Sequence, residues 1–192
     1  MQKKQKILLL DNYDSYTFNI AQILEKKDSI EFEIIKNDKI KLEEVNYFDK
    51  IILSPGPDIP SKAGKMQLLI KEFYDKKPIF GICLGMQAIA IFFGAKLYNL
   101  PQVYHGIREK IYITQESEIF NTFEKQFYGG LYHSWAVEKN SVNSPLKITA
   151  LSKNDIIMGI EHKYLPVYGV QFHPESYITQ NGNLIIENFI KI

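Results

Sequence analysis

Residues 77–93, KPIFGICLGMQAIAIFF, combine a short apolar run, a glycine-flanked turn and a helical pattern. The first part has the length and apolar character of a strand covered on both faces. The part after the turn has helical character and ends at Gly94. Between them lies Cys83, the single cysteine of the chain, with Gly81 and Gly85 on either side. This stretch predicts a strand-turn-helix unit with a thiol at the end of the strand.

Apolar runs and helical patterns alternate in the same way through the first half of the chain. Strands are expected at 6–10, 29–35 and 50–54, and helices at 18–24 and 65–74. This order is typical of a parallel sheet with helices on both faces. We therefore predict an α/β fold with an open, mostly parallel sheet.

The second half of the chain follows a different pattern, in which turns separate further apolar runs. The expected strands are 108–114, 146–152, 156–162 and 167–173, and the expected closing helix is 184–192. Such runs suggest antiparallel additions to the sheet. Because no repeat, low-complexity tract or linker divides the sequence, a single domain is expected over residues 1–192.

The composition is that of an ordinary globular protein and argues against several classes of partner. The 192 residues carry 23 Lys and Arg against 22 Asp and Glu, a net charge of +1, so no nucleic-acid or membrane partner is expected. The N-terminal apolar stretch at 7–10 is too short for a signal peptide or a membrane span. A lone thiol suits a reducing compartment, and we expect a cytoplasmic protein. One cysteine and four scattered histidines predict no metal site.

The Gly-x-Cys-x-Gly pattern at 81–85 is a nucleophile elbow with sulfur in place of oxygen. A turn this sharp needs minimal side chains at Gly81 and Gly85, because a Cβ there would collide with a neighbouring strand or helix. The thiol of Cys83 would then lie at the positive end of the following helix, which favours a thiolate. The alternative is a buried structural cysteine beside packing glycines. We interpret Cys83 as a nucleophile.

A cysteine nucleophile needs a base, and His173 is the best placed of the four histidines. It ends an apolar run, and an extended backbone would point it and Glu175 to the same side. The carboxylate can fix the imidazole tautomer and leave the second ring nitrogen free for the thiol. His133 is a competitor with no acid close in sequence, and His105 and His162 are interpreted as structural or surface residues.

Acyl chemistry also needs N–H donors for a developing oxyanion, each worth about 3 kcal/mol. Leu84, directly after Cys83, offers one backbone N–H. Gly56, in the proline-flanked loop SPGP at 54–57, offers another, because it has no side chain to block a close approach. The alternative reading of Gly56 is a tight turn only.

Five stretches of the sequence together match one family. They are DNYDSYTFN (11–19), SPGP (54–57), GICLGMQAIA (81–90), YHSWAV (132–137) and GVQFHPES (169–176). The last four resemble the class I (triad) glutamine amidotransferases, which have a flavodoxin-like α/β fold. The first resembles the branch that comprises anthranilate synthase component II and the aminodeoxychorismate synthase glutaminase. The resemblance runs from Leu8 to Phe189.

The resemblance implies a role for each matching residue. Cys83 would attack the side-chain amide of glutamine, His173 would shuttle the proton, and Glu175 would orient His173. Gly56 and Leu84 would supply the oxyanion amides. The residues that would hold glutamine are Gly56, Pro57, Asp58, Gln87, and the backbone of Ser134 and Trp135.

The resemblance further implies a reaction and a partner. Glutamine would yield glutamate and ammonia without a cofactor in this chain. The ammonia would pass to a separate chorismate-binding synthase subunit, component I, which makes anthranilate in tryptophan biosynthesis. A subunit of the folate pathway that makes aminodeoxychorismate, or one subunit that serves both pathways, is the alternative.

Three positions depart from the family pattern. Asp58 replaces the second glycine of the usual Pro-Gly-Pro-Gly loop, although Asp tolerates a left-handed backbone better than most residues. Met86 replaces a His that is frequent in this branch. Ile107 replaces the usual Lys, which puts in doubt any partner contact ascribed to that loop.

Two other classes of protein remain as alternatives. Asp11 and Asp14 after the first strand would suit the acidic metal pocket of a receiver-like module, but Ser54 and a proline stand where its phosphorylated Asp would be. A cysteine hydrolase of a related fold would share the elbow. It would not explain Gln87, YHSW and His-Pro-Glu together.

Overall fold

A computed structural model describes residues 3–192. Its main sheet has nine strands in the order β2-β1-β3-β4-β11-β10-β9-β6-β7, and a second sheet pairs β5 with β8. The strands are β1 (Gln5–Asp11), β2 (Ile30–Lys36), β3 (Lys50–Leu53), β4 (Ile79–Ile82), β5 (Leu97–Asn99), β6 (Ile107–Ile113), β7 (Gln126–Leu131), β8 (Trp135–Val137), β9 (Leu146–Ser152), β10 (Ile157–His162) and β11 (Val167–Val170). The helices are α1 (Thr17–Glu25), α2 (Met66–Phe73), α3 (Leu84–Phe92) and α4 (Asn183–Lys191), with short 3₁₀ helices at Leu42–Tyr47, Pro60–Lys62, Glu118–Phe120 and Lys139–Ser141.

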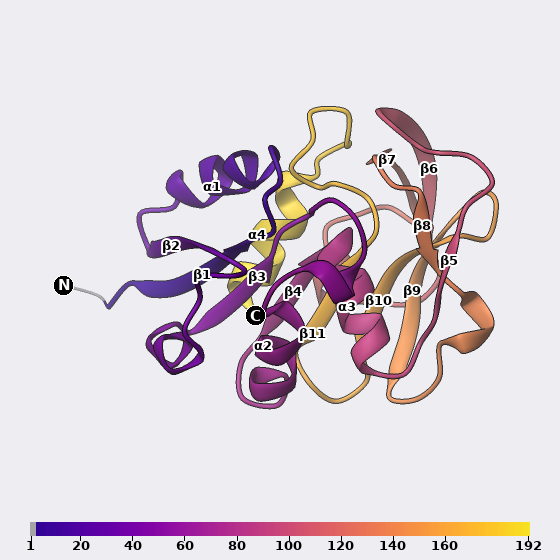
Figure 1. Ribbon diagram of the computed structural model, residues 1–192. Helices are drawn as coiled ribbons and strands as arrows, with labels where there is room; N and C mark the ends of the chain where they lie inside the picture. Colours follow the sequence, from indigo (N-terminus) through magenta and orange to yellow (C-terminus); the bar gives the residue numbers. More distant parts are fainter. Residues whose placement is uncertain (1–2) are drawn as a thin grey trace.

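The main sheet has a parallel part and an antiparallel part. Strands β2, β1, β3, β4 and β11 pair in parallel, whereas β10, β9, β6 and β7 continue the sheet with antiparallel pairing. Figure 1 shows β2, β1, β3 and β4 on one side and β9, β6 and β7 on the other. The carboxyl ends of β1, β3, β4 and β11 meet at one edge, where ligands of such sheets bind.

Helices cover both faces of the parallel part, as the sequence predicts. Successive side chains of a strand point to opposite faces, so Leu9 of β1 packs in the core with α1 and α4, whereas Leu8 and Leu10 pack in the core with α2 and α3. Phe80 of β4 and Phe189 of α4 lie with ring centroids 5.4 Å apart. Strands β3 and β4 are buried along their whole length, as central parallel strands are.

The second half of the chain contains three strands that the sequence did not predict: β5, β7 and β8. Strand β7 reads QFYGGL, which has no clear alternation, and it is held by backbone pairing with β6. Strand β11 is shorter than predicted and ends at Val170 instead of residue 173. It stops there because Ile82, which pairs with Val170, is the last residue of its partner β4.

Candidate active site

Cys83 occupies the turn between β4 and α3 in a conformation that few non-glycine residues adopt. Its φ is 52° and its ψ is −102°, and such strain costs about 1–3 kcal/mol. The Cys83 N–H donates to the carbonyl of Val170 at 2.7 Å, and the Cys83 carbonyl accepts from the N–H of Gln87 at 3.0 Å. These bonds fix the buried sulfur at the N-terminal end of α3.

The glycines beside Cys83 are required by close backbone packing. A Cβ on Gly81 would lie 2.6 Å from the backbone nitrogen of Met86, and a Cβ on Gly85 would lie 2.6 Å from the carbonyl oxygen of Leu53 in β3. Neither backbone atom can yield, so a side chain at either position would displace the helix or the strand. The packing reason given for the two glycines from the sequence is confirmed.

His173 and Glu175 meet as predicted, although the backbone between them is not extended. Ser176 N–H donates to the carbonyl of His173 at 3.2 Å and closes a turn, because the chain leaves the sheet after β11. Nδ1 of His173 lies 2.7 Å from Oε1 of Glu175, and both side chains are almost fully buried. A carboxylate accepts, so Nδ1 carries the proton. Within residues 3–192, Nε2 of His173 has no hydrogen-bond partner.

The charge of Glu175 decides the ionisation of His173. Burial alone would lower the pKa of His173, but the charge of Glu175, with further contributions from Cys83, raises this pKa well above its ordinary value. The contribution of Cys83 requires that its thiol lie close to the imidazole. Because a cation beside a thiol favours the thiolate, the two groups can form a thiolate–imidazolium pair.

The turn that carries His173 is held by the end of β7 and by the segment before α4. His173 N–H donates to the carbonyl of Gly130 at 2.9 Å. Thr179 Oγ1 donates to the carbonyl of His173 at 2.6 Å and accepts from Gly130 N–H at 2.8 Å. A Cβ on Gly182 would collide with the carbonyl oxygen of Pro174. The imidazole is therefore placed by contacts from distant parts of the sequence.

A cavity of about 130 Å³ lies beside the sulfur. Its lining residues are Gly56, Pro57, Asp58, Cys83, Leu84, Gln87, Tyr132, His133, Ser134 and Trp135. Every residue predicted to bind glutamine or to supply an oxyanion amide is among them. Gly56 lies close to Leu84, since a Cβ on Gly56 would lie 2.7 Å from the Leu84 side chain. The arrangement can hold a small amide-bearing substrate against the sulfur.

Asp58, a departure from the family pattern, takes the backbone conformation expected for it. Its φ is 67°, in the left-handed region. Its carboxylate accepts a hydrogen bond from Lys62 Nζ at 2.9 Å, and both side chains are exposed. The loop therefore keeps its course without a second glycine, and the charge of Asp58 lies at the cavity wall.

Comparisons with known proteins show the family of this chain. The chain matches the family described as Glutamine amidotransferase class-I over residues 8–192. The chain belongs to the class I glutamine amidotransferases. It is 41% identical over 186 residues to the anthranilate synthase component 2 of Lactococcus lactis, covering 96% of this chain and 93% of that protein. It is 37% identical over 195 residues to that of Thermus thermophilus, covering 99% of this chain and 94% of that protein.

The fold also matches a solved structure. A glutamine amidotransferase of Thermotoga maritima superimposes with a TM-score of 0.79 at 16% identity, over 99% of this chain and 82% of that one. At that identity the likeness concerns the fold alone. It confirms that this amidotransferase has the α/β architecture predicted from the sequence.

The sequence did not single out three residues of this amidotransferase that contact Cys83 or His173. Tyr16 and Tyr132 place their rings against His173, with centroid distances of 5.4 and 4.9 Å and edge-on geometry. Gln171 donates from Nε2 to the sulfur of Cys83 at 3.4 Å. Each lies inside a quoted motif, yet its contact depends on chain segments that only the fold brings together.

Within residues 3–192, none of the other three histidines forms an ion pair with an acid as His173 does. His133 is buried, and its Nδ1 donates to the carbonyl of Trp135 at 2.8 Å. Burial lowers the pKa of His133 to about 4, although the Trp135 carbonyl acts in the opposite direction. His162 ends β10 and accepts at Nδ1 from the N–H of Leu165 at 3.0 Å, so it is structural as predicted. His105 packs edge-on against Tyr132.

The acidic residues after β1 form a turn. Asp11 Oδ1 accepts from Tyr13 N–H and from Thr17 Oγ1, each at 2.9 Å. Within residues 3–192, no group of three or more His, Cys, Asp or Glu side chains could hold a metal ion. None of the helices in this described part is long and apolar enough to cross a membrane.

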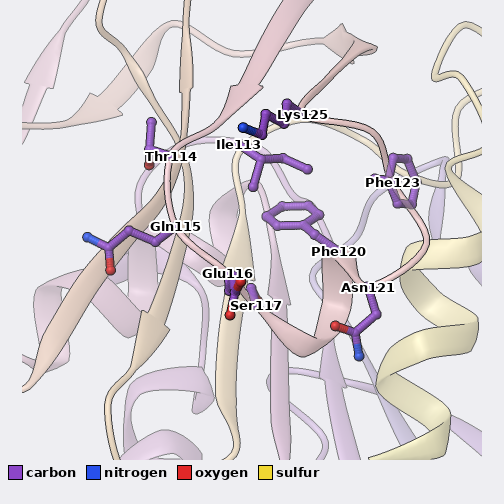
Figure 2. Close-up of a pocket in the computed structure, with 9 residues that line it drawn as sticks. All are labelled: Ile113, Thr114, Gln115, Glu116, Ser117, Phe120, Asn121, Phe123 and Lys125. Atoms are coloured by element: carbon purple, nitrogen blue, oxygen red, sulfur yellow. The ribbon is translucent and has the colours of Figure 1, made fainter.

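A larger cavity, of about 460 Å³, lies at the opposite ends of the strands from the Cys83 cavity. Figure 2 shows Ile113, Phe120 and Phe123 near one another and Lys125 above them. It forms where β6 ends and β7 begins, the two antiparallel strands whose other ends face the Cys83 cavity. It contains none of the residues predicted to act on glutamine.

Proposed function

We propose that this chain is the glutaminase subunit of a chorismate-using synthase, in which it converts L-glutamine to glutamate and ammonia. The observation that carries this proposal is the strained Cys83 with its sulfur beside a cavity lined by Gly56, Leu84 and Gln87. The full-length similarity to proteins named anthranilate synthase component 2 supports it. The charged pair of His173 and Glu175 next to that sulfur supplies the acid and base the reaction needs.

In the first half of the reaction, the Cys83 thiolate attacks the side-chain carbonyl carbon of glutamine. The developing oxyanion accepts hydrogen bonds from the backbone N–H groups of Gly56 and Leu84. Nε2 of the His173 imidazolium then gives its proton to the departing nitrogen. The carbon–nitrogen bond breaks, ammonia leaves and a thioester remains on Cys83.

In the second half, water replaces ammonia. His173 is neutral after the first proton transfer, so Nε2 takes a proton from the water that attacks the thioester carbonyl. The carbon–sulfur bond breaks, the new carboxylic acid leaves and gives its proton to solvent to become glutamate, and the thiolate–imidazolium pair is restored. Glu175 keeps the Nδ1 proton in place throughout and stabilises each imidazolium that forms.

The ammonia is consumed on a second subunit. The names of the relatives designate one component of a larger enzyme, which supports a partner for this chain as well. Ammonia released into water would be protonated and lost, so the partner must cover the site and receive it directly. We assign the partner to the chorismate-binding synthase subunits, with anthranilate as the product. Aminodeoxychorismate as the product would identify the folate-pathway partner instead.

The division of labour is tested in the complex with Cys83→Ser. We expect glutamine-dependent synthesis to fall at least about a thousandfold, because a serine hydroxyl stays protonated beside an imidazolium and is a much weaker nucleophile than a thiolate. Synthesis from added ammonium salts should stay within about twofold of the wild type, since that chemistry lies on the partner. Equal loss of both activities would contradict the proposal, and so would unchanged glutamine use.

A further inference from the structure

We propose that Gln171 is a positioning residue that holds the sulfur of Cys83 through its side-chain amide and links it to the glutamine-binding wall. This inference deepens the proposed function and rests on it only where glutamine is concerned. Gln171 is fully buried and donates from Nε2 to Cys83 Sγ at 3.4 Å. Its Oε1 accepts from Nε2 of Gln87 at 3.0 Å.

The register of the parallel sheet brings Gln171 to the sulfur. Val170 of β11 pairs with Ile82 of β4, so the next residue of each strand, Gln171 and Cys83, also lie side by side. The Gln171 backbone is fixed as well, because its N–H donates to the carbonyl of Met158 in β10 at 3.1 Å. The segment that follows β11 therefore brings both His173 and an amide to the nucleophile.

The carbonyl of Trp135 fixes the direction of the hydrogen bonds among Gln87, Gln171 and the sulfur. The carbonyl of Trp135 can only accept, and it receives a hydrogen bond from Gln87 Nε2 at 2.9 Å. The second hydrogen of that nitrogen goes to Oε1 of Gln171. Gln171 must then present its nitrogen, a donor, to the sulfur. Both hydrogens of Gln87 Nε2 are committed, so Gln87 has its oxygen left to accept from a substrate.

A donor at the sulfur favours the thiolate over the thiol. A hydrogen bond to an ionised acceptor is about twice as strong as one to a neutral acceptor. Gln171 therefore stabilises the reactive form of Cys83 and restricts where the sulfur can point. Because Gln87 and Trp135 line the cavity, glutamine binding there would strengthen the hydrogen bonds that connect Trp135, Gln87, Gln171 and the sulfur.

Other groups also act on the sulfur, and the test has to leave them unchanged. The charged groups around Cys83 are the imidazolium of His173, paired with Glu175, and the carboxylate of Asp58 at the cavity wall. His133 lines the same cavity and is neutral near pH 7, because burial lowers its pKa to about 4. The N-terminal end of α3 adds a fixed partial positive charge. Replacement of Gln171 alters none of these charges.

The experiment measures alkylation of the single cysteine by iodoacetamide from pH 5 to pH 10, in the full chain without glutamine. Gln171→Met keeps the length of the side chain and removes the donor. We expect its alkylation midpoint to move about one unit to higher pH, a tenfold loss of thiolate below the midpoint. A midpoint equal to that of the wild type would overturn the proposal.

A matched control separates this effect from general loss of stability. Asn188 in α4 is another buried amide, whose Nδ2 donates to the carbonyl of Ile119 at 3.1 Å, away from the sulfur. Asn188→Leu should leave the midpoint unchanged, and a shift like that of Gln171→Met would contradict the proposal. If Gln171→Met does not fold, Gln171→Asn serves, because its shorter amide cannot reach the sulfur and should give the same shift.

This readout does not depend on glutamine turnover. A chain that shows the shift but lacks glutaminase activity in the complex would contradict the proposed function and leave the role of Gln171 standing. If the chain is an active glutaminase but its Gln171→Met variant is alkylated like the wild type, the role of Gln171 is contradicted and the proposed function stands. In an active complex, we expect Gln171→Met to lower kcat about tenfold, with a smaller change in KM.

Discussion

The loop after β7 and the turn after β11 each bring one buried histidine to the same end of the sheet. The pKa values of the two histidines shift in opposite directions. His133 has only the carbonyl of Trp135 as a partner, and burial lowers its pKa to about 4. Burial acts on His173 in the same sense, but Glu175 and Cys83 raise its pKa well above the ordinary value. The carboxylate of Glu175, 2.7 Å from Nδ1, together with Cys83 therefore decides which imidazole carries charge near pH 7.

The different partners of His133 and His173 explain why the same residue type has different roles on neighbouring loops. A neutral imidazole that keeps Nδ1 on a carbonyl can shape the cavity wall, but it offers no cation to the sulfur. A charged imidazole beside Cys83 stabilises a thiolate and holds the proton that a leaving ammonia needs. Substitution of either histidine, or of Glu175, removes part of this difference.

The largest expected effect is on turnover. In the complex, His173→Gln should lower glutamine-dependent kcat/KM at least about a thousandfold, because both proton transfers lose their group. His133→Gln should lower it about tenfold or less, since His133 contributes only to the cavity wall. The measurement is glutamate release at saturating partner.

Ammonium-dependent synthesis in the same samples is the control, and it should survive in both variants. If His133→Gln loses as much glutamine-dependent activity as His173→Gln, a neighbouring carboxylate does not identify which histidine is the catalytic base. The assignment of roles to the two loops would then be wrong.

The second effect is on stability, and its sign differs between the two histidines. His133 has its pKa lowered to about 4 from 6.5, so the unfolded chain takes up a proton that the folded chain does not, and stability falls as pH drops below 6.5. Between pH 7 and pH 5 this should cost about 2 kcal/mol. The raised pKa of His173 gives stability that is present below 6.5 and lost as pH rises through its folded pKa.

Denaturant unfolding at pH 7 and pH 5 measures this difference. In His133→Gln the fall in unfolding free energy between the two pH values should be smaller than in the wild type by about 2 kcal/mol. Equal falls in the two proteins would show that His133 does not stay neutral when it is buried.

Much of the Cys83 half of the site could be predicted from sequence because its causes are local. Gly81 and Gly85 have no room for a side chain, because backbone atoms a few residues away or on the adjacent strand lie too close. The Gly-x-Cys-x-Gly spacing in the sequence reflects this constraint. The pairing of His173 with Glu175 was also predicted, but from an extended backbone that the chain does not adopt. Two residues of separation allow a contact in a turn as well as in a strand, so the letters alone do not distinguish the two.

What the sequence could not predict depends on register and on long-range pairing. Gln171 reaches the sulfur because β11 aligns with β4 in one register, which no local pattern specifies. Tyr16 packs on His173 from the other end of the chain. Strands β5 and β8 have three residues each and exist through their pairing with one another, so they carry too few positions for a periodic signal.

The smallest expected effect comes from removing the charge of Glu175 while keeping its shape. In Glu175→Gln the amide oxygen can still accept from Nδ1 of His173, so the tautomer is kept and only the charge is lost. Burial then lowers the pKa of His173 with only the contributions of Cys83 against it, and fewer molecules hold the imidazolium at neutral pH. We expect kcat to fall about tenfold, because fewer molecules hold the proton that the leaving ammonia needs, and the alkaline limb of the pH–rate profile to move to lower pH. A profile that keeps its wild-type position would mean that the two histidines differ for some reason other than this carboxylate, because no other acid lies within hydrogen-bonding distance of His173 in residues 3–192.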